Sequence, residues 1–149
     1  MKRILQLAVL LVLPFLLAGC LTPVANEIPL VHGDLSAKAS NPNDTKLVIF
    51  NDSNFLMYGL DQTGRINVSL NGKGLTQINI GRYAQVIVPK GTCQVYLVHW
   101  DTDKFASQHE FDLTNDESFL EIHAKITSNE ANLLSELPED FEKKFKPIW

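Results

Sequence analysis

The chain has 149 residues, of which 45% are hydrophobic and 20% are charged, so its composition predicts one folded domain with a short appendage. Thirteen basic residues stand against 17 acidic ones, which gives a formal net charge of −4 at pH 7. This acidic balance argues against nucleic-acid binding and against adhesion to anionic lipid through charge.

The appendage is at the start of the chain and has the layout of a secretory signal. Residues 1–3 form a short basic start, and small residues stand at Ala18 and Gly19. The apolar run between them, residues 4–17, is shorter than the about 20 residues that a membrane-spanning helix needs. We therefore expect residues 1–19 to be a signal peptide that is removed from the mature protein.

The end of this leader, Leu17-Ala18-Gly19-Cys20, resembles the bacterial lipobox. The resemblance implies that a signal peptidase recognises Leu17, Ala18 and Gly19, that cleavage precedes Cys20, and that the Cys20 thiol carries a diacylglycerol. The several acyl chains of a bacterial lipoprotein would hold firmly, because each buried CH₂ contributes about 0.8 kcal/mol. The alternative is an ordinary secreted protein with an incidental cysteine.

Loss of the leader would make the lipid at Cys20 the means of membrane attachment. The mature chain keeps 11 basic and 17 acidic residues, a net charge of −6. Position 21 is leucine, not the aspartate that typically retains lipoproteins in the inner membrane. The resemblance therefore implies the outer membrane of a two-membrane bacterium, facing the periplasm. Cys93 is the one other cysteine, so no intrachain disulfide is expected.

Residues 20–44 are predicted to be a lipidated N-terminus and flexible tether. They carry Pro23, Pro29 and Pro42 and show weak hydrophobic periodicity. Such a segment would let the domain stand away from the bilayer. A short apolar piece, Ile28 to Val31, offers a place where the segment docks on the domain instead.

Residues 45–149 are expected to form a mainly β domain. Apolar residues alternate with polar ones in short runs between turn-like clusters, which favours an antiparallel β-sandwich of about seven to eight strands. The strand around Val95 to Trp100 is apolar on both faces and is expected to be central and buried on both sides. The expected strands cover residues 46–50, 55–60, 66–70, 78–80, 84–88, 95–100, 105–113 and 120–126.

The last 20 residues are predicted to be helical in part. Leucines recur at helical spacing over residues 130–137, and Pro138 suits a first helical turn. Phe141 and Phe145 are four residues apart, which places both rings on one helix face. We expect a short helix that packs on the edge or face of the sheet.

The stretch Val68 to Thr76, VSLNGKGLT, admits two interpretations. Two glycines beside Lys73 suggest a phosphate-binding loop, but such a loop precedes a helix, and an alternating run follows Gly74. Asn71 and Gly72 both tolerate positive φ, which is typical of a tight hairpin. The stretch is therefore predicted to be a turn between two strands.

That turn, a Gly-x-Tyr step at Gly81-Arg82-Tyr83 and a Pro-x-Gly turn at Pro89-Lys90-Gly91 follow one another along the chain. The pattern resembles a family of small bacterial lipoproteins that carry a PEGA-like β-sandwich domain of unknown function. The resemblance covers residues 46–145 and implies no catalytic residues. The chain departs from the pattern after the second turn, where Cys93 replaces a common histidine, and at residues 118–120, where a common tyrosine pair is missing.

Groups that could carry chemistry are scattered along the chain. No HxH or HExxH spacing joins the histidines, so neither a metal site nor a cofactor is expected. If residues 92–100 and 104–112 form a hairpin, His109 lies opposite about position 95. If 104–112 pairs with 117–126, His123 lies opposite about position 107.

Cys93 is expected to be a small buried apolar residue, and no nucleophile elbow occurs. The acidic pairs at residues 101 and 103 and at 116 and 117 are expected in turns. Four aromatic residues, if they cluster, suggest core packing or, alternatively, a sugar or peptide platform: Tyr83, Tyr96, Trp100 and Phe105.

These patterns together favour a non-enzymatic outer-membrane lipoprotein. Its partners would be membrane lipid, through the acylated Cys20, and a protein or other component of the cell envelope that the periplasmic β-sandwich binds. The alternative is a structural subunit of an envelope-spanning assembly of the secretion type.

Overall fold

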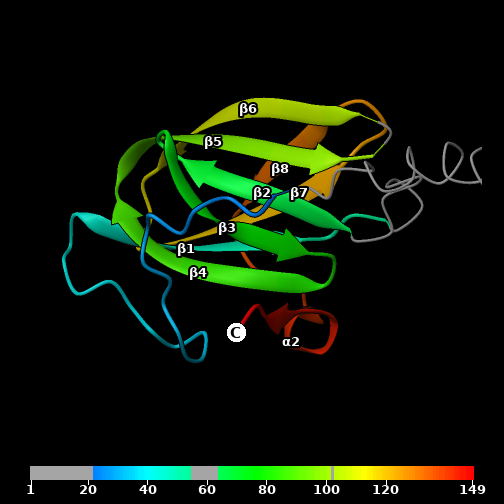
Figure 1. Ribbon diagram of the computed structural model, residues 1–149. Helices are drawn as coiled ribbons and strands as arrows, with labels where there is room; N and C mark the ends of the chain where they lie inside the picture. The colour runs from blue at the N-terminus through cyan, green and yellow to red at the C-terminus, as the bar shows by residue number, and fades with distance from the viewer. Residues whose placement is uncertain (1–21, 55–63, 102) are drawn as a thin grey trace, which may run out of the picture.

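The computed structural model describes residues 22–54, 64–101 and 103–149, and these form a β-sandwich with one short helix (Figure 1). The expected leader with Cys20, and the expected strand 55–60, lie outside the described residues. The described strands are β1 (Asp44–Asn51), β2 (Arg65–Leu70), β3 (Lys73–Asn79), β4 (Arg82–Pro89), β5 (Gly91–Trp100), β6 (Lys104–Leu113), β7 (Glu117–Ala124), β8 (Asn129–Leu134) and β9 (Lys146–Pro147), with α2 (Phe141–Lys144) before β9.

Two sheets make up the sandwich. One has five strands in the order β8-β7-β1-β4-β9, and the other has four in the order β3-β2-β5-β6. The four-stranded sheet is antiparallel throughout, whereas β1 pairs with β7, and β4 with β9, in parallel. The mainly β sandwich with a short C-terminal helix, predicted from the alternating pattern, is confirmed.

The main core lies between the two sheets and is built from alternate residues of the strands. In β1, Leu47 and Ile49 belong to this core, and Val95 and Leu97 of β5 pack into it from the other sheet. All four side chains are at most 1% exposed. Period-two alternation puts one row of each strand inside, which explains why the sequence pattern marks these positions.

The outer face of the five-stranded sheet has a smaller core of its own. Val48 and Phe50 of β1 turn to this face and pack with Tyr83, Phe141 and Phe145. The Phe141 and Phe145 rings stack with their centroids 5.0 Å apart, as the four-residue spacing predicted. The helix α2 therefore covers this face of the sheet, and β1 is buried on both sides.

The hairpin interpretation of VSLNGKGLT is confirmed. Asn71 and Gly72 have φ of +50° and +78°, and Leu70 lies opposite Lys73 at the end of the β2–β3 pair. The left-handed backbone at both central positions matches the twist of the strands, which is why asparagine and glycine stand there. The pairing shifts register at Ser69, which faces Gly74, so β3 carries a bulge just after the turn.

The helical prediction for residues 130–137 is wrong. Residues 129–134 form β8, which pairs with β7 and sets Leu133 opposite Leu120 and Leu134 opposite Phe119. The two leucines thus lie on opposite faces of an edge strand, so sheet pairing overrides their helical spacing. The expected short helix is present only as α2, after this strand.

Other expectations about faces and pairing also need correction. The strand β5 is central in its sheet and is buried on both faces from Leu97 to His99, but Tyr96 is 41% exposed, so burial on both sides does not extend along the whole strand. His109 lies opposite Val95, as predicted from the β5–β6 hairpin. The pairing of residues 104–112 with 117–126 is wrong, because β6 and β7 belong to different sheets and His123 faces Glu130.

Candidate functional site

Residues 22–35, which we call the strap, lie along the sandwich as an extended segment. Figure 1 shows them in blue, crossing β2 and β3 before they continue toward the five-stranded sheet. At its start, the Thr22 carbonyl oxygen accepts a hydrogen bond of 2.7 Å from Asn67 Nδ2 on β2. The expectation of a tether that stands free of the domain is therefore wrong for this part of the chain.

The strap crosses β3 at Gly74, where the two backbones come very close. The Glu27 N–H donates to the Gly74 carbonyl oxygen at 2.8 Å, and the Gly74 N–H donates to Glu27 Oε2 at 2.6 Å. A Cβ atom added to Gly74 would lie 2.2 Å from the Ala25 carbonyl oxygen. A glycine is therefore required here, and the bulge in β3 leaves the Gly74 amide and carbonyl available to the strap.

Further along, the strap passes to the edge of the other sheet. Leu30 forms an antiparallel bridge with Val86 of β4, and the Val31 N–H donates to the Gln85 carbonyl oxygen at 2.8 Å. Ile28 and Leu30 pack against the main core. The predicted docking of the apolar piece Ile28 to Val31 is confirmed, and the strap links both sheets across their open edge.

The strap ends over the outer face of the five-stranded sheet, beside a buried lysine. Lys46 Nζ on β1 donates to the Leu35 carbonyl oxygen and lies 2.6 Å from Glu117 Oε1 on β7. The Lys46 side chain is 1% exposed, whereas that of Glu117 is 38% exposed. An almost fully buried ammonium needs such partners, because burial of an unpaired charge costs several kcal/mol.

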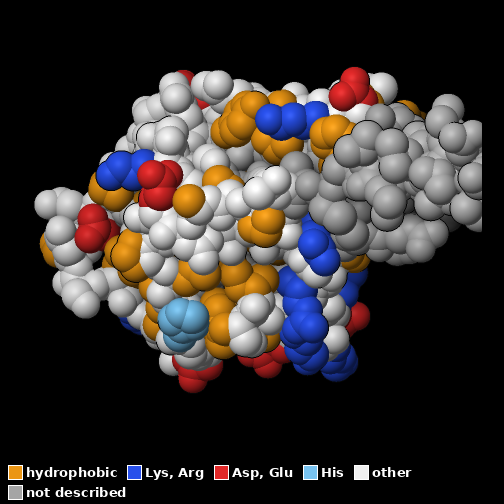
Figure 2. All heavy atoms as spheres, viewed as in Figure 1, with side chains coloured by type: hydrophobic (Ala, Val, Ile, Leu, Met, Phe, Trp, Pro, Cys, Tyr) orange, Lys and Arg blue, Asp and Glu red, His pale blue; other side chains and the backbone are white. Residues whose placement is uncertain are grey.

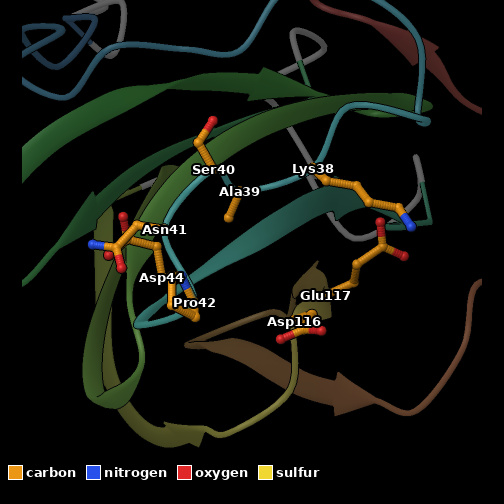
Figure 3. Close-up of a pocket in the computed structure, with 8 residues that line it drawn as sticks. All are labelled: Lys38, Ala39, Ser40, Asn41, Pro42, Asp44, Asp116 and Glu117. Carbon is orange, nitrogen blue, oxygen red and sulfur yellow. The ribbon is translucent and has the colours of Figure 1, made fainter.

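A pocket of about 480 Å³ opens next to this ion pair, between the loop that precedes β1 and the start of β7 (Figure 3). In Figure 3 the Lys38 side chain extends toward the Glu117 carboxylate. The pocket is lined by Lys38, Ala39, Ser40, Asn41, Pro42, Asp44, Asp116 and Glu117. Six of these eight residues carry polar or charged side chains, and Ala39 and Pro42 are the apolar members.

Two of the carboxylates in this pocket are already paired with lysines. Asp116 Oδ1 lies 2.7 Å from Lys90 Nζ, and this hydrogen bond is the main reason that the pKa of Asp116 lies below its ordinary value. Glu117 is paired with Lys46. Over the described residues no group of three or more His, Cys, Asp or Glu side chains is placed to hold a metal ion.

The other residues considered from the sequence are spread over the fold. Cys93 is 1% exposed in the main core, and burial raises the pKa of its thiol, which fits the predicted role as a small apolar residue. Of the four aromatic residues considered as a possible cluster, three belong to β5 and β6, namely Tyr96, Trp100 and Phe105, whereas Tyr83 packs against Phe141 on the other sheet.

His99 is the histidine that has a structural role at the sandwich interior. Its Nδ1 lies 2.7 Å from Asn129 Oδ1, and the Asn129 amide donates to the carbonyl oxygens of Leu97 and Phe105 at 3.2 and 3.3 Å. Asn129 is in β8, so this group ties one sheet to the other. The alternation of β5 places His99 on the inner face, but sequence reasoning gave no sign that Asn129 is its partner.

Comparisons with protein-family models, with curated proteins and with solved structures gave no significant match for this chain. Within the residues that the structure describes, no helix has the length and apolarity required to cross a bilayer.

Proposed function

We propose that the protein is a lipid-anchored, non-enzymatic component of a bacterial cell envelope, located at the outer membrane and facing the periplasm. The observation that carries the proposal is the position of the lipobox-like Leu17-Ala18-Gly19-Cys20 directly before the strap. An acylated Cys20 would stand two residues ahead of Thr22, which is hydrogen-bonded to the folded domain. The anchor and the domain would then be joined without a spacer.

The sandwich would present a surface for a protein or another envelope component, and the pocket beside Lys38 is a candidate site on it. The pairing of Glu117 with Lys46 and of Asp116 with Lys90, together with the buried Cys93, supports structural roles for these groups. A PEGA-like lipoprotein domain is consistent with this proposal, and it rests on the Gly-x-Tyr and Pro-x-Gly motifs and on the β-sandwich fold.

The anchor is tested with Cys20→Ala in cells that are labelled with a radioactive fatty acid. We expect the wild type to carry label and to fractionate with the outer membrane, and the variant to stay as an unlabelled precursor. Cys93→Ala is the matched control and should keep both label and location. Labelling that persists in the Cys20 variant would contradict the lipid anchor.

A structural subunit of an envelope-spanning assembly is the second candidate, and crosslinking in intact cells followed by mass spectrometry separates the two. One stable partner recovered in fixed stoichiometry favours the subunit, whereas several partners in variable amounts favour a binding module. A hydrolase activity of the purified protein that a single substitution abolishes would contradict the non-enzymatic proposal.

A further inference from the structure

We propose that the outer face of the four-stranded sheet lies against the lipid bilayer, with the side chains of β5 at the level of the headgroups. This inference rests on the proposed lipid anchor at Cys20 and adds to it an orientation of the domain. The geometry that carries it is the place where the strap begins, together with the side chains that surround this place.

The start of the strap fixes the distance between anchor and sheet. Thr22 is bound to Asn67, and Asn67 lies opposite Val98 in the β2–β5 pairing, near the middle of the outer face. Only two peptide steps separate Thr22 from Cys20, and an extended chain spans at most about 3.6 Å per residue. An acyl group on Cys20 would therefore hold this face within about 7 Å of the lipid surface.

Two aromatic side chains on this face suit a membrane interface. Tyr96, Val98 and Trp100 follow one another along the outer side of β5; Tyr96 is 41% exposed and Trp100 is partly exposed, whereas Val98 between them is buried, at 6%. Tyrosine and tryptophan favour the level of the headgroups because their rings are apolar at one end and polar at the other. Figure 2 shows hydrophobic and basic side chains next to one another over β5 and β6.

Uncharged neighbours flank Tyr96 and Val98 on both sides. Val98 lies between Asn67 of β2 and Ala106 of β6, and Tyr96 lies between Ser69 and Gln108 in the same way. These small or neutral side chains would let the Tyr96 ring approach the lipid without removing charged groups from water, whereas Trp100 lies opposite Lys104.

The charges on the face do not oppose contact with anionic lipid. Arg65 and Lys104 stand at the Trp100 end of the row, and Glu110 and Asp112 stand toward the other end, so these four charges sum to zero. The mature chain as a whole would carry −6. The basic end can meet lipid phosphates, so the Trp100 end is expected to lie deeper than the end near Glu110.

The two tryptophans of the chain provide a matched pair of probes for this orientation. Trp100 lies on the proposed membrane face. Trp149 packs against His32 and Tyr83, with ring centroids 5.0 and 6.0 Å apart, on the side of the five-stranded sheet. Trp149→Phe leaves Trp100 as the single tryptophan, and Trp100→Phe leaves Trp149.

The experiment uses the mature acylated protein, which begins at Cys20, in phosphatidylethanolamine–phosphatidylglycerol vesicles with and without brominated acyl chains. We expect brominated lipid to reduce the tryptophan fluorescence of Trp149→Phe and to leave that of Trp100→Phe unchanged. Equal quenching of both variants, or quenching of Trp149 alone, would overturn the orientation. If Trp100 is unquenched in bound, acylated protein, the face is free for a protein partner and the orientation is again wrong.

The mass of the N-terminal peptide is measured on the same samples. It distinguishes failure of the proposed orientation from failure of the lipid anchor. An unmodified Cys20 together with loss of vesicle binding would overturn the proposed function and the orientation with it. A diacylated Cys20 with unquenched Trp100 would overturn the orientation alone.

Discussion

The Lys46 ammonium lies 2.6 Å from the Glu117 carboxylate across the parallel β1–β7 pair, on a side chain that is 1% exposed. Lys46 also donates to the Leu35 carbonyl oxygen, so one buried cation joins both strands to the end of the strap. The surrounding face of β1 is apolar, with Val48 and Phe50 on the same side. A lysine on this face therefore depends on its two partners.

Removal of the carboxylate is expected to cost more than removal of the lysine. Glu117→Gln leaves a buried ammonium without its counter-charge and should lower the free energy of unfolding by about 1–3 kcal/mol. Lys46→Met fills the same space without a charge and should change the free energy of unfolding by less than about 1 kcal/mol. Urea unfolding of the wild type and of both variants measures these changes in the free energy of unfolding. A larger loss of stability in Lys46→Met than in Glu117→Gln would contradict the interpretation that the buried ammonium depends on the Glu117 carboxylate.

The Asn129 side chain is expected to be a stabilising polar link between the sheets. Asn129→Ala removes the partner of His99 Nδ1 and two bonds to backbone carbonyls, all in the interior, and should destabilise the fold by about 1–3 kcal/mol or more. Asn132→Ala on the same strand removes only a 3.4 Å contact with Glu130 and is the control. Thermal unfolding followed by circular dichroism should separate the two, and equal midpoints would contradict the assignment.

The substitution Gly74→Ala should release the strap. Its Cβ would meet the Ala25 carbonyl oxygen at 2.2 Å, so the strap must move away from β3 and a non-specific protease should cut within residues 22–35. Gly72→Ala is the matched control, because no atom lies within 4 Å of its Cβ. Its φ of +78° still costs about 1–2 kcal/mol, but the strap should stay protected from cleavage. Equal cleavage of both variants would show that the clash is not the cause.

The low pKa of Asp116 is expected to depend on Lys90. Because the folded-state pKa lies below the ordinary value, the stabilising contribution is present above that ordinary value and is lost as pH falls through the folded-state pKa. In Lys90→Met the Asp116 pKa should rise toward its ordinary value, which NMR titration of the carboxyl carbon reports. Glu130, whose pKa Lys125 lowers, should not change in this variant.

Local pattern was enough to predict much of the sandwich. The Asn71-Gly72 turn requires positive φ at two adjacent residues, which Asn-Gly tolerates well, so the hairpin could be predicted, although the bulge at Gly74 that shifts its register could not. For the β5–β6 hairpin the register was also predictable, with Val95 opposite His109, because a short turn fixes the pairing of the strands on either side.

Pairing between distant segments was not predictable in this way. Leu133 and Leu134 fit a helix by spacing, and only the neighbouring strand β7 makes them part of a sheet. The strap is held by backbone atoms of Gly74 and Gln85, and hydrogen bonds of this kind leave almost no trace in side-chain pattern. Three prolines in residues 20–44 suggested a tether, yet proline also suits an extended segment that lies on the edge of a sheet.

The bridge between Leu30 and Val86 has a practical consequence for anyone who produces this domain. A recombinant fragment that begins at Thr45 leaves the backbone of β4 around Gln85 without the partner that Val31 supplies. An uncovered strand of this kind pairs readily with the same strand of another molecule, so the shortened protein is expected to self-associate and precipitate. Expression from Thr22 onward keeps that edge covered.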